Sequence, residues 1–113
     1  MKQFMLFFRG EYGNVPKENP EAFKDIAKKW QDWTNKLSAD GKWVAAGTQL
    51  NPAGKVIKPD GIVTDGPYTE TKEILMSYCT IQADSMEEAV ELSRDCPHFV
   101  VGGNVEIREL VTY

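Results

Sequence analysis

Hydrophobic side chains alternate between the two faces of an extended chain over residues 2–9. One face carries Phe4, Leu6 and Phe8, and the other carries Met5 and Phe7. A strand with apolar side chains on both faces is typical of a sheet that is covered on both sides. The segment therefore predicts a first strand. Residues 10–20, rich in Gly, Asn and Pro, predict a loop after it.

The period of the pattern changes over residues 21–39, which predict an amphipathic helix. Its apolar residues recur at spacings of three and four: Phe23, Ile26, Ala27, Trp30, Trp33 and Leu37. Pro20 suits the first helical position, and Gly41 suits the stop. Burial of this apolar stripe should stabilise the fold by ~1.5–3 kcal/mol per large side chain.

The middle of the chain predicts short extended segments separated by turns. Strands are expected over 43–50, 55–58 and 62–64, with turns over 51–54 and 59–61 and a break over 65–67. Residues 74–82 (ILMSYCTIQ) predict a long strand that again has apolar groups on both faces.

A second helix is predicted to begin after Ser85, where Ser85 and Glu88 have the spacing of a capping box. We expect it to run to about Asp95 and to bury Met86, Ala89, Val90 and Leu92. Cys96–Pro97 should end it, because a residue before proline disfavours helical geometry. Gly102–Gly103 then predicts a flexible turn, and residues 104–111 predict the last strand.

This order of elements is the βαββαβ pattern of a ferredoxin-like α+β fold, in a single domain over residues 1–113. Two helices can cover only one face of its antiparallel sheet, which leaves an apolar face open. We expect a second copy to cover that face and form a homodimer, since large exposed apolar faces mark association surfaces. The alternative is that the loops over 10–20 and 51–73 fold back as a lid.

Composition narrows the class of protein. Of the 113 residues, 42% are hydrophobic and 27% are charged, which is typical of a globular domain, and the net charge of −4 argues against nucleic-acid binding. No apolar segment is long enough to cross a membrane. The start of the chain reads as a strand rather than a signal peptide, so we expect a cytoplasmic protein. Two cysteines, expected to be reduced, and one histidine do not make a structural zinc site, and we expect no metal or cofactor.

One segment is specific to a known family. Residues 63–73 (VTDGPYTETKE) resemble the signature of the DGPF, or YCII-related, domain family. Supporting pieces along the chain are Trp33 with Leu37 and Gly41, Ala46–Gly47 with Leu50 and Pro52, and Cys96–Pro97. The resemblance implies the dimeric α+β barrel form of the ferredoxin-like fold.

The resemblance implies less about activity. Some YCII-like proteins carry a histidine on the first helix and an aspartate before the proline that follows the second helix, proposed as a catalytic pair. The matching positions here hold Trp30 and Cys96, so an imidazole–carboxylate mechanism is not carried over. DGPF relatives also occur beside extracytoplasmic-function sigma factors, which implies a regulatory association by analogy.

The polar segment after residue 64 holds three candidate ligand-binding residues. Asp65, with Gly66 and Pro67, can be a turn that caps its own backbone. It can also lie with Glu70 at the mouth of a dimer cleft, where Tyr68 would stack on a ligand.

The remaining candidates are His98, Trp30 and Arg9. His98 can act as a general base, but a loop histidine that bonds a backbone carbonyl is the favoured interpretation; Asp65 and Asp95 are its best possible carboxylate partners. Trp30 can line a cavity, and Arg9 can bind an anion or be a solvated strand end. Cys96 lies at the negative end of a helix, which disfavours a reactive thiolate.

Two functions fit these features. The first is a small-molecule binding protein, or a weak lyase or isomerase, with its site in a cleft of the homodimer. The second is a regulatory accessory that binds a partner such as a sigma factor through acidic surface helices. The residues do not by themselves define a reaction.

Overall fold

A computed structural model describes residues 1–11, 19–66 and 73–113. The elements, in chain order, are β1 (Lys2–Gly10), α1 (Pro20–Ala39), β2 (Trp43–Ala46), β3 (Gly54–Ile57), β4 (Val63–Gly66), β5 (Ile74–Ala83), α2 (Met86–Ser93), the short 3-10 helix η2 (Pro97–Val101) and β6 (Asn104–Glu109).

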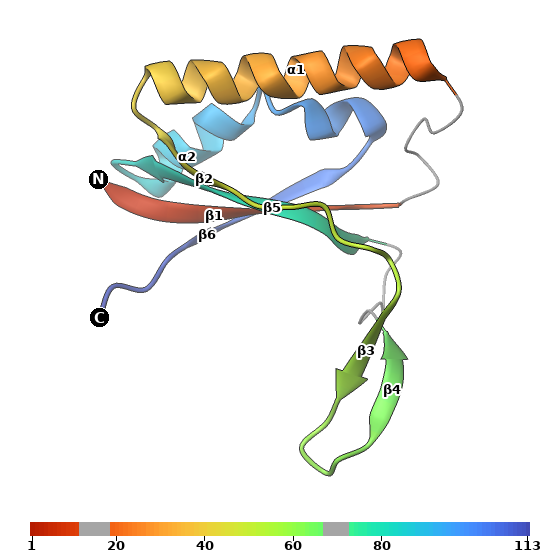
Figure 1. The fold of residues 1–113 in the computed structure, drawn as a ribbon. Coiled ribbons are helices and arrows are strands. Elements are labelled where there is room, and N and C mark those ends of the chain that lie inside the picture. Colours follow the sequence, from red (N-terminus) through yellow and green to blue (C-terminus); the bar gives the residue numbers. More distant parts are fainter. Residues whose placement is uncertain (12–18, 67–72) are drawn as a thin grey trace.

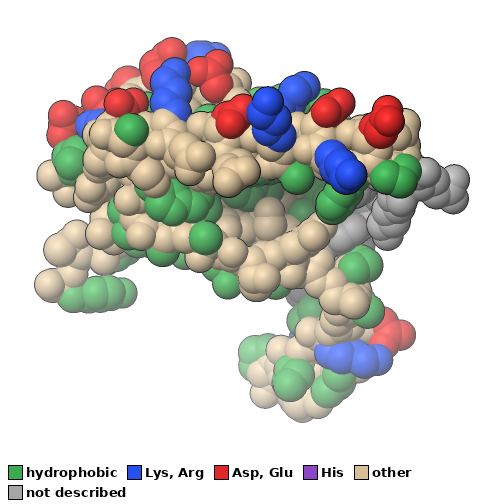
Figure 2. Space-filling view, turned by 45° about the horizontal axis from the view of Figure 1, so that its top comes forward, with side chains coloured by type: hydrophobic (Ala, Val, Ile, Leu, Met, Phe, Trp, Pro, Cys, Tyr) green, Lys and Arg blue, Asp and Glu red, His purple; other side chains and the backbone are tan. Residues whose placement is uncertain are grey.

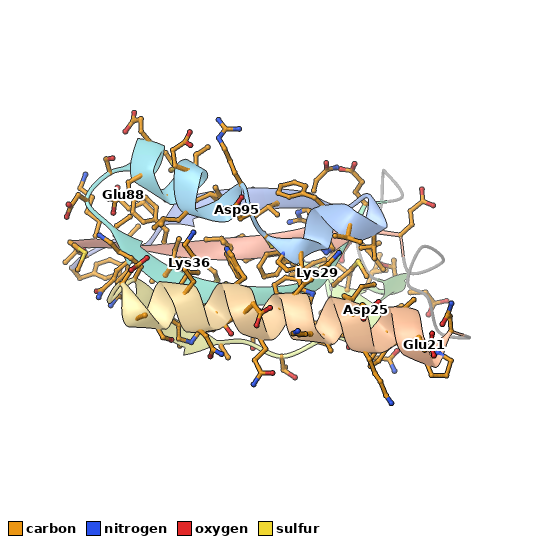
Figure 3. The ribbon with its side chains drawn as sticks, turned by 90° about the horizontal axis from the view of Figure 1, so that it is seen from above. Glu21, Asp25, Lys29, Lys36, Glu88 and Asp95 are labelled. Atoms are coloured by element: carbon orange, nitrogen blue, oxygen red, sulfur yellow. The ribbon has the colours of Figure 1, made fainter. Side chains whose placement is uncertain are left out.

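Four strands form one antiparallel sheet in the order β2-β5-β1-β6. The helices α1, α2 and η2 lie on the same face of this sheet (Figure 1) and run side by side when seen from above (Figure 3). This arrangement confirms the prediction of an α+β fold of the ferredoxin-like type. A separate hairpin, β3–β4, is inserted between β2 and β5 and projects away from the sheet (Figure 1).

The core lies between the sheet and the helical layer. In β1, Phe4, Leu6 and Phe8 are buried beneath the helices, as the alternation of the first strand requires. Trp33 and Leu37 of α1 pack into the same core. Trp33 also fastens the two helices together, because its indole Nε1 donates to the carbonyl oxygen of Leu92 at 3.1 Å.

The helix α1 begins and ends near the predicted residues. Its cap is Asn19, whose side chain accepts hydrogen bonds from the backbone of Glu21 and Ala22, and Pro20 takes the first helical position. Gly41 follows the helix with a φ of 71°, a conformation that suits glycine.

Several details of the second helix differ from the sequence-based expectation. The Ser85 hydroxyl accepts from the Glu88 backbone as a capping box requires, but the Glu88 carboxylate accepts from the Asp84 backbone instead of that of Ser85. Met86 is 39% exposed, contrary to the prediction, because α2 turns it away from the sheet. Ser93 is buried in its place, and its hydroxyl donates to the Ala89 carbonyl at 2.8 Å.

The strand after α1 is shorter than predicted. Residues 43–50 were expected to be extended, but β2 ends at Ala46 after an irregularity between Trp43 and Ala45. The pairing resumes at Leu50, whose N–H donates to the Met76 carbonyl at 2.7 Å. The chain thus leaves the sheet edge over 47–49 and returns to it, which sequence alternation does not signal.

The hairpin also corrects one expectation. Asp65 and Gly66 were predicted to break the chain, but both belong to β4 and pair with Lys55 and Gly54 of β3. Among the described elements, β3 and β4 form their own two-stranded sheet and join no other strand. Ile57, Ile62 and Val63 are largely exposed on this hairpin, with Ile57 at 74%.

The face of the sheet opposite the helices, here called the open face, is uncovered by any described element (Figure 1). Met5 and Phe7 lie at its centre and are half-buried. Three of their four cross-strand neighbours are polar: Met5 pairs with Thr80 and Arg108, and Phe7 pairs with Glu106 and the aromatic Tyr78. The open face is therefore more mixed than the alternation of the first strand alone suggested. Homodimer formation through it stays a prediction.

No helix in the described part of the chain is long and apolar enough to span a membrane.

Candidate functional site

A cavity of about 380 Å³ lies between the first half of α1 and the sheet. In Figure 2 the surface is hollowed below this helix, and hydrophobic side chains border the hollow. The apolar walls come from β1, α1, β2, β5 and η2: Phe8, Ile26, Trp30, Trp43, Met76 and Val101. Ligand pockets in proteins commonly measure ~300–1,000 Å³, so this cavity can hold a small molecule.

The cavity exists because only half of the apolar stripe on α1 is buried. Trp33 and Leu37 fill the core, whereas Phe23, Ala27 and Trp30 border the cavity instead. Phe23 is 57% exposed, contrary to the expectation that the whole stripe would be covered. The N-terminal half of the helix thus bridges a space that its own side chains do not fill.

Aromatic rings in edge-to-face contact stiffen the inner wall. The ring of Trp30 lies 5.1 Å from that of Phe8 at 84° and 5.7 Å from that of Trp33 at 81°. Trp33 in turn contacts Trp43 at 6.1 Å and 82°. Such pairs contribute about 0.5–1.5 kcal/mol beyond area burial, so this wall holds its shape.

His98 forms a polar corner of the cavity. The residue is only 5% exposed, and its ring lies 5.5 Å from that of Phe8. Its Nε2 is 2.7 Å from the backbone carbonyl oxygen of Arg9. Because a carbonyl only accepts, Nε2 carries the hydrogen, and in the neutral ring Nδ1 then holds a free lone pair.

The lone pair of His98 Nδ1 has no hydrogen-bond donor within the described residues. In that same part of the chain, every fully buried side-chain nitrogen or oxygen has a partner. Nδ1 is therefore not fully buried, and the ring that carries it lines the cavity. The imidazole is thus a candidate acceptor for a molecule bound in the cavity.

One glycine makes room for the histidine. A Cβ on Gly103 would lie 2.6 Å from His98 Cε1 and closer still to Nε2, whereas a Cβ on Gly10 would make only an ordinary contact of 3.7 Å with Nε2. The sequence predicted Gly102–Gly103 as a flexible turn. Gly102 does have a turn conformation, with φ of 74°, but Gly103 is required for the close approach of the imidazole.

Both thiols are held in the neutral form. Burial, with a smaller effect of Cys96, raises the pKa of Cys79 to about 12. Burial also raises the pKa of Cys96 to about 12, against a small lowering by a hydrogen bond from the His98 backbone. Cys79 lines the cavity, but neither cysteine supplies a thiolate nucleophile at neutral pH.

The six residues predicted from the sequence do not form one site. Trp30 and His98 both line the cavity. The Arg9 guanidinium forms an ion pair with Glu106 at 3.0 Å, and only the Arg9 carbonyl contacts His98. The Asp65 side chain, 90% exposed, pairs with Lys55 on the hairpin and does not border the cavity.

Tyr68 and Glu70, the other two candidates, lie outside the described residues. His98 bonds a backbone carbonyl, as the favoured interpretation held, and neither Asp65 nor Asp95 is its partner. Sequence reasoning missed the polar rim of the cavity: Thr34, Thr48, Gln49 and Ser77. No motif marks these residues, because they come from three separate parts of the chain: α1, β5 and the segment after β2.

Within the described residues, no three His, Cys, Asp or Glu side chains gather closely enough to hold a metal ion.

Comparison with known protein families identifies the family to which this fold belongs. The YCII-related domain matches residues 5–112 of the chain. The chain belongs to the YCII-related family. This YCII-related protein is also similar to an uncharacterized protein of Rhizobium meliloti (strain 1021), with 37% identity over 70 residues. That alignment covers 61% of the chain and 52% of the relative, so the matched region spans about half of the relative's length. The resemblance to the YCII-related family drawn from the sequence is confirmed.

Proposed function

We propose that this YCII-related protein binds a small, uncharged and largely apolar molecule in the cavity beneath α1. The observation that carries the proposal is the lining itself, which includes no Asp, Glu, Lys or Arg among the described residues. A charged ligand would lose its hydration there without gaining a counter-ion. The walls favour an apolar molecule, because every Å² of apolar surface removed from water contributes ~25 cal/mol.

The site belongs to a single chain in this proposal. The sequence-based hypothesis set it in a cleft between two copies, near Asp65. The described cavity instead lies on the helical side of the sheet, and all its lining comes from one chain. Binding should therefore survive dissociation of a dimer, and Asp65→Ala should leave ligand affinity unchanged.

A thermal-shift screen over neutral aromatic and aliphatic compounds tests the proposal, followed by calorimetry on the hits. A ligand present at 100 times its Kd should stabilise the fold by about 2.7 kcal/mol. The blocking variant is Ala27→Phe, because Ala27 borders the cavity and is exposed, so a larger side chain can enter the space. The matched control is Ala39→Phe, at the exposed end of the same helix and outside the lining.

Loss of binding in Ala27→Phe but not in Ala39→Phe would support the proposal. A panel without any stabilising compound, or equal binding by both variants, would remove it.

We also propose that the protein forms a homodimer through the open face. Met5 and Phe7 supply an apolar centre, and charged groups such as Arg9 and Glu106 surround it. The β3–β4 hairpin supports the same proposal, since an isolated two-stranded hairpin is marginally stable in water and this one exposes Ile57. Each feature would be covered by a second copy.

Sedimentation velocity at micromolar concentration tests the dimer. Phe7→Glu places a charge at the centre of the open face and should shift the protein to monomer. Lys28→Glu changes charge on an exposed position of α1 and should not. A monomer in the unsubstituted protein contradicts the proposal.

The regulatory alternative, with a sigma factor as partner, draws less support from the surface. It was expected to use acidic helices. Only α2 fits, with three glutamates, whereas α1 carries four lysines against Glu21, Asp25 and Asp32. Figure 3 shows both signs of charge along α1. A pull-down that returns a stoichiometric partner unaffected by Ala27→Phe would favour this alternative over ligand binding.

A further inference from the structure

The cavity combines aromatic walls with an imidazole that carries one unpaired acceptor, and this combination limits the ligand beyond its being uncharged. We propose that the ligand is a flat, neutral aromatic molecule of about two fused rings that carries one N–H or O–H group, which donates to Nδ1 of His98. This inference rests on the proposed function of the cavity and adds the chemical class of its ligand.

The direction of the hydrogen bond follows from the tautomer. The Arg9 carbonyl at 2.7 Å requires the hydrogen on Nε2, so Nδ1 can only accept in the neutral ring. The ring cannot turn over without losing that bond, and Phe8 and Gly103 both lie close to it. A ligand group that also accepts would face the Nδ1 lone pair and leave it unsatisfied.

Other polar groups of the lining are poorer partners. The Thr34 hydroxyl already donates to the Gln31 carbonyl at 3.1 Å, and Thr48 and Gln49 are exposed at the rim. Cys79 is a neutral thiol and a weak donor. Ser77 and Tyr78 also line the cavity and are half-buried, but a hydroxyl can both donate and accept. His98, 95% removed from solvent, is the lining group whose bond to the Arg9 carbonyl fixes the direction of its remaining hydrogen bond.

The volume of the cavity and the aromatic side chains of its walls favour a ligand with fused aromatic rings. An engineered 150 Å³ cavity is known to bind benzene, so about 380 Å³ has room for a bicyclic molecule. Phe8 and Trp30 already meet edge to face at 5.1 Å, and an aromatic ligand can extend this packing. Aliphatic ligands of the same volume would lack these contacts.

Indole and benzofuran form a matched pair of probes, because they share shape and size but differ in one atom. Indole carries an N–H donor where benzofuran carries an oxygen acceptor. Isothermal calorimetry on the unsubstituted protein should find indole bound about 3- to 10-fold more tightly, as expected for one neutral hydrogen bond in a partly desolvated site. The ratio should fall to about one in His98→Gln, whose amide can still donate to the Arg9 carbonyl.

A spectroscopic readout separates a direct contact from a structural effect. The chain has a single histidine, so its two imidazole ¹⁵N resonances belong to His98 without further assignment. Indole should move the resonance of the unprotonated Nδ1 and leave that of Nε2 nearly in place, whereas benzofuran should move neither by a comparable amount. This measurement needs no variant.

The outcomes are distinct. Preference for indole together with a shift of Nδ1 supports the inference. Equal affinities, tighter binding of benzofuran, or an unmoved Nδ1 resonance overturns the inference and leaves the proposed binding function standing. No binding of either probe up to its solubility, with no hit in the thermal-shift screen, overturns both.

Discussion

Replacement of Gly103 by alanine should displace His98 and lower the free energy of unfolding by about 3 kcal/mol. The added Cβ would lie 2.6 Å from His98 Cε1 and closer to Nε2, so the imidazole has to move. Movement breaks the bond to the Arg9 carbonyl, and an unsatisfied buried acceptor costs about 1–3 kcal/mol. Overpacking of the surrounding side chains adds about 1–3 kcal/mol.

Urea unfolding followed by tryptophan fluorescence measures this loss, because all three tryptophans lie in or against the core. Gly102→Ala is the neighbouring control. Its added Cβ meets no atom within 4 Å, so only the φ of 74° opposes it, at a cost of about 1–2 kcal/mol. The Gly103 variant should be the less stable of the two.

A double-mutant cycle isolates the clash from other effects of the added methyl group. In a His98→Ala background the imidazole is gone, and Gly103→Ala should then cost less than about 1 kcal/mol. If Gly103→Ala costs the same with and without the imidazole, the reasoning that Gly103 exists to admit His98 is refuted.

Three other outcomes are expected. Cys79 and Cys96 should resist iodoacetamide at mildly alkaline pH until the protein unfolds, because burial raises both pKa values to about 12; rapid labelling of either native thiol would contradict this. Glu88→Gln should destabilise the fold at neutral pH, since hydrogen bonds from Lys42 and then the Asp84 backbone hold the pKa of Glu88 below its ordinary value of 4.5. That contribution is present above pH 4.5 and lost as the pH falls through the lower folded-state value, so urea midpoints of the variant and the parent should converge in strong acid. Ser85→Ala removes the cap of α2 and should cost about 1 kcal/mol in the same urea assay, and an unchanged midpoint would show that the cap is dispensable.

Local patterns predicted most of the fold, because they depend on near neighbours in the sequence. The alternation in residues 2–9 and the helical period over 21–39 each correspond to one element, β1 and α1. Where a tertiary contact decides where an element ends, the sequence pattern predicts the wrong boundary. The strand from Trp43 stops at Ala46, and Gly47 lies so close to Tyr78 that it has no room for a Cβ.

The candidate site could be predicted only in part, for a physical reason. Trp30 and His98 were proposed from their residue types, and both border the cavity. The cavity itself is space left between distant segments, and no residue pattern encodes a space. The partner of His98 is a main-chain carbonyl. Every residue has such a carbonyl, so the sequence could not single out that of Arg9.

The bond between His98 and the Arg9 carbonyl joins positions 89 residues apart. During synthesis the ribosome releases β1, α1 and the long strand β5 well before the segment that carries the imidazole. A chain that ends before this segment lacks the imidazole, and with it the group proposed to distinguish one aromatic ligand from another. Under the proposed function, discrimination between ligands would therefore begin only once η2 has been synthesised.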